Sequence, residues 1–352
     1  MISEFTKQDF RLKQGCGRPD TLVDFDSGKA NSSLQRYVVE TVALKRPLSV
    51  MCGATVVGIT GEDAKTAVTG VSVRLPDGTL QEVKSPVVVV SGGSVGSARL
   101  LSASRGSVTV KESVGANFWD VPQVVLQYRT KDRSSHNCLF DPLVSAFLKA
   151  DLRFSKPVLS LLSSYDDLMA LWSPKAGAAP EATILFQPFT LNNDGTSPLS
   201  GEHGCQFVVR PLRPFSRGKV NADGTVDPNY FSAAGDLENL QNAVRYVKEQ
   251  LVKKTPFIPI IGDLVGERLE SSGINGGSCA SVVDPTTFQV TGTDGLYLCD
   301  GSIIPGALSG NPIPYKLALA DKFVDKLLKK KDVRRKVEDA DAESGGSTRI
   351  VY

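Results

Sequence analysis

The feature that most constrains the fold is a run of four valines at 87–90, which leads directly into Ser91, Gly92 and Gly93. Four consecutive β-branched residues favour a strand that is buried on both faces, as strands are in an α/β sheet. The residues that follow, SVGSARLLSAS, have the composition of a helix. The segment therefore predicts a strand, a glycine turn and a helix in direct succession.

A second segment near the C-terminus has a similar order. It reads LYLCDGSIIPGALSGNPIPYKLALA, a strand that runs into a Gly/Pro loop and then an amphipathic helix. Glycines let a ligand approach the backbone closely, and a helix N-terminus favours an anion or a polarised oxygen. Neither segment is the GxGxxG dinucleotide fingerprint, and the nearest match, Gly92-Gly93-x-x-Gly96, is weak by itself. Tight turns that bind no ligand are the alternative interpretation.

The middle of the chain differs in kind. Residues 118–230 hold scattered strands and many prolines, which indicates an antiparallel sheet with helices rather than further βαβ units. Residues 235–253 have the apolar stripe of an amphipathic helix. A length of 352 residues leaves room for about two domains. We therefore expect an α+β protein in which an α/β portion accompanies a domain built on an antiparallel sheet.

Composition excludes several classes of protein. Forty Lys and Arg residues against 38 Asp and Glu give a net charge of +2, without the dense basic surface of a nucleic-acid binder. No stretch approaches the roughly 20 apolar residues of a membrane-spanning helix. The first residues lack the apolar core of a signal peptide, which leaves the localisation open. The six cysteines form no CxxC pair or zinc-type cluster, so no metal site is expected, and Cys52 and Cys299 are interpreted as buried free thiols.

Four segments, in order, resemble the glucose–methanol–choline (GMC) oxidoreductases, a family of flavoprotein alcohol and sugar oxidases and dehydrogenases. They are SSLQRYVVETVALKRPLSVMCGATVVGI, VVVVSGGSVGSARLL, RPFSRGKVNADGTVDPNYFSAAGDLENLQNAVRYVKE and VVDPTTFQVTGTDGLYLCDGSIIPGALSGNP. The match covers roughly residues 31–330 in register. The short sequences GSA, GTDGL and SGNP resemble those of the cellobiose-dehydrogenase-like branch. The resemblance implies FAD as the cofactor and an alcohol or sugar hydroxyl as the substrate.

The resemblance also implies five residues near the adenosine and diphosphate parts of FAD. Val56 matches the strand residue whose backbone meets the adenine in the family. Ser91 and Gly92 match the turn beside the adenosine. Asp300 and Gly301 match the pair that contacts the ribityl–pyrophosphate part.

Three further residues are implied at the flavin end. Asn311 matches the family's active-site asparagine, which would orient the substrate hydroxyl. Pro312 and Ile313 match the start of the helix that points at the pyrimidine edge, where the Ile313 N–H would donate to a flavin carbonyl.

Each assignment has a structural alternative that the sequence leaves open. Val56 fits an ordinary core strand, and Ser91 with Gly92 fits a simple turn. Asp300 fits the cap of an Asx turn, and Asn311 before a proline fits a helix N-cap.

The sequence departs from the family at the catalytic base. The family's histidine takes the substrate hydroxyl proton, a role suited to an imidazole near neutral pH. Here the matching position is Ile274 or Gly273, and the adjacent Asn275 cannot act as a base. The chain's two histidines, His136 and His203, lie elsewhere and are interpreted as loop residues.

A second departure is that no GxGxxG βαβ unit is present, so the expected fold is the GMC type without that N-terminal unit. The expected organisation is an irregular segment at 1–30, FAD-side parts at 31–116 and 274–330, a substrate domain at 117–273 and a disordered charged tail at 331–352.

The predicted function is FAD-dependent oxidation of a CH–OH group by an incomplete or degenerate family member. The alternatives are a non-catalytic homologue that serves as a binding or interaction module, and a C-terminal part of a split enzyme. In the latter case, an FAD-binding portion on another chain would be the partner.

Overall fold

A computed structural model gives the structure of the protein. It describes residues 15–17, 38–39, 41, 44, 48–62, 66–131, 168–192, 203–254, 257–310, 312–329 and 348–351. The chain divides into two compact units. The first unit comprises residues 1–37, 121–212 and 234–272, and the second comprises 38–120, 213–233 and 273–352.

The first unit is built on an antiparallel sheet. Its strands, in spatial order, are β1 (Gly15–Gly17), β8 (Leu168–Trp172), β9 (Ala182–Gln187), β10 (Gly204–Pro211) and β7 (Ala116–Thr130), and β13 (Ile261–Gly276) also pairs with β7. Every neighbouring pair from β1 to β7 is antiparallel, as the alternating strands of the middle segment predicted. The sheet therefore supplies the antiparallel part of the expected α+β class.

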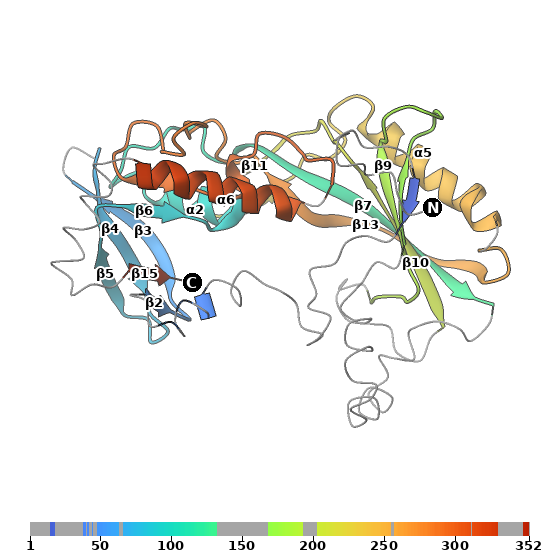
Figure 1. Ribbon diagram of the computed structural model, residues 1–352, viewed down its shortest axis with the longest axis horizontal. Helices are drawn as coiled ribbons and strands as arrows, with labels where there is room; N and C mark the ends of the chain where they lie inside the picture. The colour runs from blue at the N-terminus through green and yellow to red at the C-terminus, as the bar shows by residue number, and fades with distance from the viewer. Residues whose placement is uncertain are drawn as a thin grey trace, which may run out of the picture. The chain divides into compact units, whose positions relative to one another are not determined.

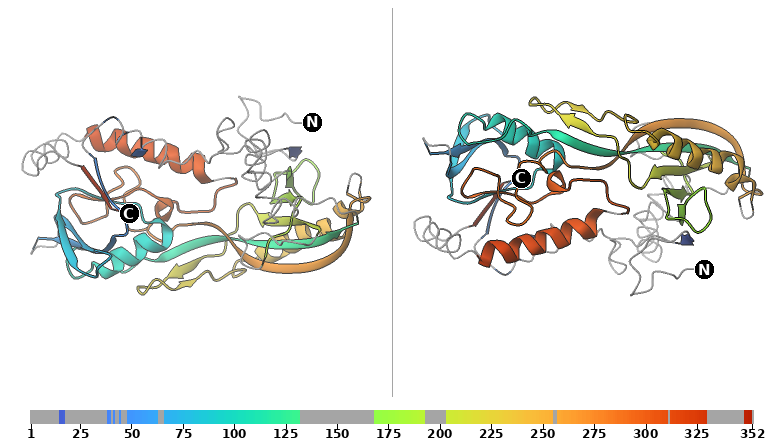
Figure 2. Two further views of the ribbon diagram at one scale, coloured as in Figure 1. Left: turned by 90° about the horizontal axis from the view of Figure 1, so that it is seen from below. Right: turned by 90° about the horizontal axis from the view of Figure 1, so that it is seen from above.

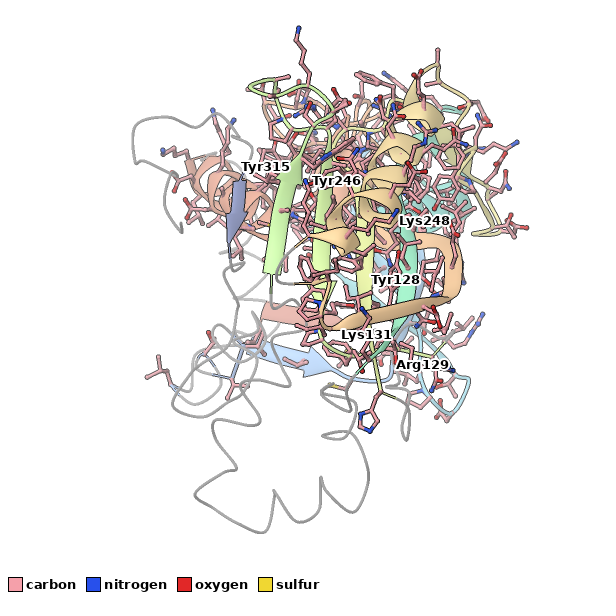
Figure 3. All side chains as sticks on the ribbon, turned by 90° about the vertical axis from the view of Figure 1, so that its right-hand side faces the viewer. Tyr128, Arg129, Lys131, Tyr246, Lys248 and Tyr315 are labelled. Carbon is pink, nitrogen blue, oxygen red and sulfur yellow. The ribbon has the colours of Figure 1, made fainter. Side chains whose placement is uncertain are left out.

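The helix α5 (Asp236–Glu249), followed by the short η3 (Leu251–Lys253), packs on this sheet in the first unit (Figure 3). Between them lie aromatic rings: the centroids of Phe186 and Phe207 are 5.2 Å apart, and those of Phe207 and Phe257 are 5.4 Å apart. Lys248 of α5 forms an ion pair with Glu267 of β13, with 2.5 Å between Nζ and Oε2. One apolar stripe of the helix thus buries the sheet face that carries the aromatic residues.

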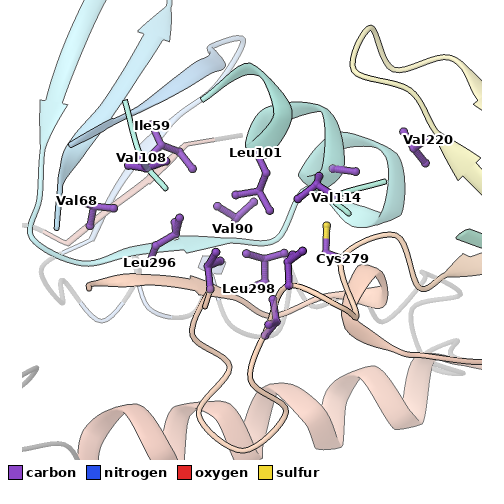
Figure 4. Close-up of a cluster of buried hydrophobic side chains, with 14 of the residues drawn as sticks. Ile59, Val68, Val90, Leu101, Val108, Val114, Val220, Cys279, Leu296 and Leu298 are labelled. Carbon is purple, nitrogen blue, oxygen red and sulfur yellow. The ribbon is translucent and has the colours of Figure 1, made fainter. Parts of the chain in front are cut away.

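The second unit contains a parallel pair of strands, β6 (Val88–Val90) and β14 (Leu296–Leu298). The helix α2 (Gly93–Ala103) covers one face of the pair and α6 (Pro312–Lys329) covers the other, as Figure 2 shows. Leu296 and Leu298 pack with Leu101 of α2 in one cluster of buried side chains (Figure 4), while Tyr297 packs with Phe323 of α6. A strand between two helices is the α/β arrangement predicted from the valine run.

One expectation for the valine run is wrong. The strand β6 is not buried on both faces, because Val89 is 42% exposed whereas Val90 is 6% exposed. Within the described part of the chain β6 pairs only with β14, and α6 packs on the β14 side through Tyr297. Val89 itself is therefore left exposed, although Val87 packs against the cluster of Tyr297 and Phe323.

Smaller sheets complete the second unit. They are the antiparallel β3 (Thr55–Gly61), β4 (Val68–Arg74) and β5 (Leu80–Lys84), the parallel pair β2 (Leu48–Met51) and β15 (Thr348–Val351), and the hairpin β11 (Gly218–Val220) and β12 (Val226–Asp227), which pairs with the start of β7. The turn between β4 and β5 contains Asp77, whose carboxylate accepts from the Thr79 N–H at 2.9 Å. This Pro-Asp-Gly turn was predicted from the sequence. Figure 1 shows the order of these elements along the chain.

Three segments differ from the expected organisation. Residues 213–233 belong to the second unit rather than to a continuous segment 117–273, because β11 pairs with the N-terminal end of β7 and β12 pairs with β11. Residues 15–17 and 348–351 form strands, although the surrounding ranges were expected to be irregular or disordered. The alternating, β-branched sequence of β15 suits pairing with β2. No helix among the described residues is long and apolar enough to span a membrane.

Candidate cofactor site

The candidate site lies where β6 and β14 end. Because the two strands are parallel, their carboxyl ends lie at the same edge of the sheet. Ser91 and Gly92 follow β6 there, and Cys299 to Gly301 follow β14. In open α/β sheets ligands bind outside the carboxyl ends of the strands. The topology therefore brings four of the residues predicted from the sequence to one location.

Hydrogen bonds join the two strand ends. The Ser91 hydroxyl donates to the Cys299 carbonyl at 3.0 Å. The Gly93 N–H donates to Asp300 Oδ2 at 2.9 Å, and the Ser97 hydroxyl donates to the same oxygen at 2.6 Å. These residues are more than 200 positions apart in the sequence. The side chain of Asp300 thus fixes the first turn of α2 to the end of β14.

The other carboxylate oxygen of Asp300 serves the loop after β14. Oδ1 accepts the Ser302 N–H at 2.7 Å, which is the Asx-type cap that the sequence left open as an alternative. The carboxylate also places a negative charge at the N-terminus of α2, where the helix dipole favours it. All of these bonds are within the chain, so ligand contact by Asp300 stays a prediction.

Two glycines keep the backbone open at the strand ends. A Cβ on Gly92 would lie 3.2 Å from the Ser97 N and 3.3 Å from the Gly96 carbonyl carbon. A Cβ on Gly301 would lie 3.2 Å from the Asn275 carbonyl oxygen. A Cβ at either position would be tighter than ordinary contact, and only Gly92 is exposed to a ligand.

The segment where the family keeps its base lies against Gly301. The Gly277 N–H donates to the Gly301 carbonyl at 3.2 Å, which holds the end of β13 beside the loop after β14. Gly273 has a φ of +73°. The nearby Asn275 amide donates to the Gly273 carbonyl at 3.5 Å. The structure thus brings this segment to the site, and its residues 273–276 contain no titratable side chain.

The start of α6 is also at this location, through a residue that the sequence did not single out. Lys316 lies beside Gly301: a Cβ on that glycine would be 3.3 Å from Lys316 Cε and 3.5 Å from its Nζ. Pro312 is buried and Ile313 is 41% exposed. Asn311 falls outside the described residues, and its predicted catalytic role stays a prediction.

Val56 lies apart from these residues, in β3 of the three-stranded sheet. It pairs with Val73 of β4 and packs against the buried cluster of Ala54, Val73 and Val83. The structure gives this side chain the packing of an ordinary core strand. Contact of its backbone with a ligand is untested.

The two thiols near the site have raised pKa values. Burial raises the pKa of Cys279 to about 12 and that of Cys299 to about 11, and the charge of Asp300 adds to both shifts. Both are free thiols, as is Cys52. The interpretation of Cys52 as buried is wrong, because this residue lies exposed in the turn between β2 and β3, and Cys299 is only partly buried. Among the described residues no group of three His, Cys, Asp or Glu side chains could hold a metal ion.

The structure does not place either histidine at the site. His203 belongs to the first unit, where its carbonyl accepts the Thr130 N–H at 3.1 Å. His136 lies outside the described residues.

The fold and the site define a class: an α+β protein with a polar, glycine-containing turn at the carboxyl ends of two parallel strands. Comparison with known families gives a match to GMC oxidoreductase in two parts, an N-terminal one over residues 2–123 and a C-terminal one over residues 214–320. The chain belongs to the GMC oxidoreductase family.

Individual relatives agree with this assignment. The chain is 26% identical to the oxygen-dependent choline dehydrogenase of Staphylococcus saprophyticus over 90% of its own length, and 27% identical to that of Rhizobium rhizogenes over 83%. These matches span 66% and 60% of the two relatives.

Solved structures support the fold. An FAD-dependent oxidoreductase from Chaetomium thermophilum superimposes with a TM-score of 0.72 at 16% identity, covering 90% of this chain and 68% of that one. A formate oxidase of Aspergillus oryzae gives a TM-score of 0.68 at 19% identity, covering 80% and 61%. The expected α+β fold of the GMC type is confirmed.

Proposed function

We propose that the protein binds FAD at the carboxyl ends of β6 and β14 and takes part in the oxidation of a small alcohol or sugar. The observation that carries the proposal is the junction at Asp300, which holds the Ser91–Gly92 turn and the Asp300–Gly301 loop together. Membership of the GMC family supports the cofactor and the alcohol class. The resemblance to the cellobiose-dehydrogenase-like branch stays a prediction within that class.

The residues at this location fit a dinucleotide. Gly92 presents exposed backbone without a Cβ at the end of β6, in the place where α/β sheets bind nucleotides, whereas Gly301 after β14 is buried. The α2 first turn carries no acidic side chain of its own. One feature limits the fit: the Gly93 N–H is already bonded to Asp300, so a phosphate would have to use other donors. We therefore assign the binding to the exposed turn at Ser91 and Gly92 and to the loop at Gly301.

The chemistry that FAD supplies when bound is acceptance of a hydride from the alcohol carbon. The chain's own residues would orient the substrate and hold the cofactor. Asp300 fixes the turn through its three hydrogen bonds, and Pro312 and Ile313 would present the start of α6 to the flavin edge. Asn311 would hold the substrate hydroxyl by its side-chain amide.

Removal of the hydroxyl proton is the step that the residues at the matching position support least. The residues at the matching position, Gly273, Ile274 and Asn275, do not titrate. We infer that the chain by itself oxidises alcohols slowly, because a positioned base contributes typically 10²- to 10⁴-fold. A degenerate family member that retains FAD and loses fast turnover fits this account.

The proposal is tested on the purified full chain by its flavin content and by dye-linked alcohol oxidation. We expect bound FAD, weak oxidation of simple alcohols, and loss of that activity in Asn311→Ala with flavin content unchanged. Gln241→Ala serves as the matched control, because it removes an exposed side-chain amide from α5 of the first unit. Colourless protein that gains no flavin when FAD is added would refute the cofactor, and an Asn311→Ala variant as active as the parent would refute the site.

A second candidate is an interaction role, which the open face of β6 favours. Val89 is 42% exposed on a parallel strand, whereas strands of parallel sheets are normally buried on both faces. The occupant would be an apolar surface of a polypeptide that carries an FAD-binding unit. Mixing the chain with the unmatched part of the S. saprophyticus relative should give a complex on size-exclusion chromatography, and Val89→Lys should weaken it. Two separate peaks in both cases would refute this candidate.

A further inference from the structure

The loop at residues 304–310 leads directly to Asn311, the predicted catalytic residue, and has little hydrogen bonding of its own. Among the described residues, one backbone bond lies within it, from the Gly310 N–H to the Leu308 carbonyl at 2.9 Å. A loop with so few internal bonds keeps one conformation only where other parts of the chain hold it. The residues that contact this loop therefore decide where its end lies.

Side chains from the start of β7 hold the beginning of the loop. Trp119 donates its indole N–H to the Ile304 carbonyl at 2.7 Å, and Asn117 donates its side-chain amide to the Pro305 carbonyl at 3.3 Å. Both donors belong to the second unit, as the loop does. The loop is thus anchored where it begins.

Residues 213–217, here named the clamp segment, hold the other end of the loop. Arg213 Nη1 donates to the Ser309 hydroxyl at 2.8 Å, two residues before the predicted catalytic asparagine. Nη2 of Arg217 lies 3.5 Å from the position that a Cβ would take on Gly306. The clamp segment opens one of the four sequence segments that resemble the family, and it also belongs to the second unit.

The clamp segment is itself fixed by hydrogen bonds. Arg217 Nη1 donates to the Pro214 carbonyl at 3.0 Å and to the Ser216 carbonyl at 2.9 Å. The Asn229 side-chain amide donates to the Arg217 carbonyl at 2.9 Å. A group whose own conformation is fixed can hold a neighbouring segment in place, so this arrangement suits a support for the loop.

We propose that Arg213 is a positioning residue that, through Ser309, sets the place of Asn311 relative to the substrate hydroxyl. The inference rests on the proposed function and adds to it a residue and a role. An arginine suits this role because its planar guanidinium fixes the direction of its hydrogen bonds. A misplacement of about 1 Å at a reacting group can cost about 100-fold in rate, so a contact two residues away affects catalysis. Arg213 takes no part in proton or hydride transfer.

The test is the rate of anaerobic flavin reduction by a simple alcohol in the FAD-loaded full chain. Arg213→Met should lower the limiting rate about 10- to 100-fold, with the half-saturating alcohol concentration and the flavin content close to those of the parent. Arg213→Lys keeps a donor and should recover part of the loss. Arg245→Met, which removes an exposed arginine of α5 that is bonded to Asn242, is the matched control and should react as the parent does.

A double variant distinguishes positioning from a general structural role. In an Asn311→Ala background, Arg213→Met should lower the limiting rate no further, because its effect passes through Asn311. A further loss in that background would overturn the inference. A limiting rate for Arg213→Met within twofold of the parent would also overturn it and leave the proposed function standing.

Hydrogen–deuterium exchange gives a readout that does not depend on activity. Arg213→Met and Ser309→Ala should each speed exchange in peptides that span residues 304–310, and Arg245→Met should not. Unchanged exchange in those peptides would overturn the inference whether or not the protein is active. A parent protein that binds no FAD, or whose flavin no alcohol reduces, would refute the proposed function itself.

Discussion

Replacement of Asp300 by asparagine tests the junction on which the site depends. The asparagine oxygen can still accept the Ser302 N–H, but its NH₂ group faces the donors Gly93 N–H and Ser97 Oγ–H. The Ser97 hydroxyl can rotate and accept, whereas the Gly93 N–H loses its partner. One charge-assisted bond is lost and one N–H is left without a partner, so the free energy of unfolding should fall by about 2–3 kcal/mol.

The two tryptophans allow this loss to be assigned to the second unit. Trp119 lies in the second unit, fully buried, with its indole N–H donating to the Ile304 carbonyl at 2.7 Å, and Trp172 lies in the first. In a Trp172→Phe background, fluorescence therefore reports on the second unit alone. With a urea m-value of about 1–3 kcal/mol/M, Asp300→Asn should lower the midpoint by about 0.7–3 M.

The matched control is Asp77→Asn, since Asp77 accepts from the N–H and hydroxyl of Thr79 in an exposed turn. It should shift the midpoint much less, because its bonds are local and solvated. An Asp300→Asn protein that unfolds at the parent midpoint would show that Asp300 does not hold the strand ends together.

Three further predictions follow from the packing and the thiols. Gly276→Ala should destabilise the second unit by about 3 kcal/mol or more in the same urea assay, because its Cβ would overlap the Trp119 ring. Gly96→Ala, with open space around its Cβ in α2, should instead be neutral or stabilising by up to about 1 kcal/mol, and equal effects of the two would contradict the packing described. At pH 8 iodoacetamide should label exposed Cys52 and spare Cys205 and Cys279, whose pKa values burial raises to about 12, as peptide mass spectrometry would show. Because these raised values favour the neutral thiol, the folded state should lose stability as the pH rises from about 9 toward 12, and stability that increases over that range would contradict the assignment.

The local elements of the site could be predicted from the sequence. The valine run and its glycines correspond to β6 and α2, and the periodicity of PYKLALADKFVDKLLKK corresponds to α6. These elements depend on the residues of one segment, so a local pattern identifies them.

The contacts between elements could not be predicted in this way. The bonds from Gly93 and Ser97 to Asp300 join residues 207 and 203 positions apart, and only the parallel pairing of β6 with β14 creates them. The exposure of Val89 depends on where α6 packs. The sequence does not distinguish Lys316 from the other lysines of its amphipathic helix, and only the fold shows that it lies beside Gly301.

The most direct test of the central claim is hydrogen–deuterium exchange of the full chain with and without FAD. FAD at the carboxyl ends of β6 and β14 should slow exchange in peptides that contain residues 91–97 and 299–303, and leave β9 and β10 of the first unit unchanged. Protection confined to other segments, or no change in any peptide at saturating FAD, would contradict the account.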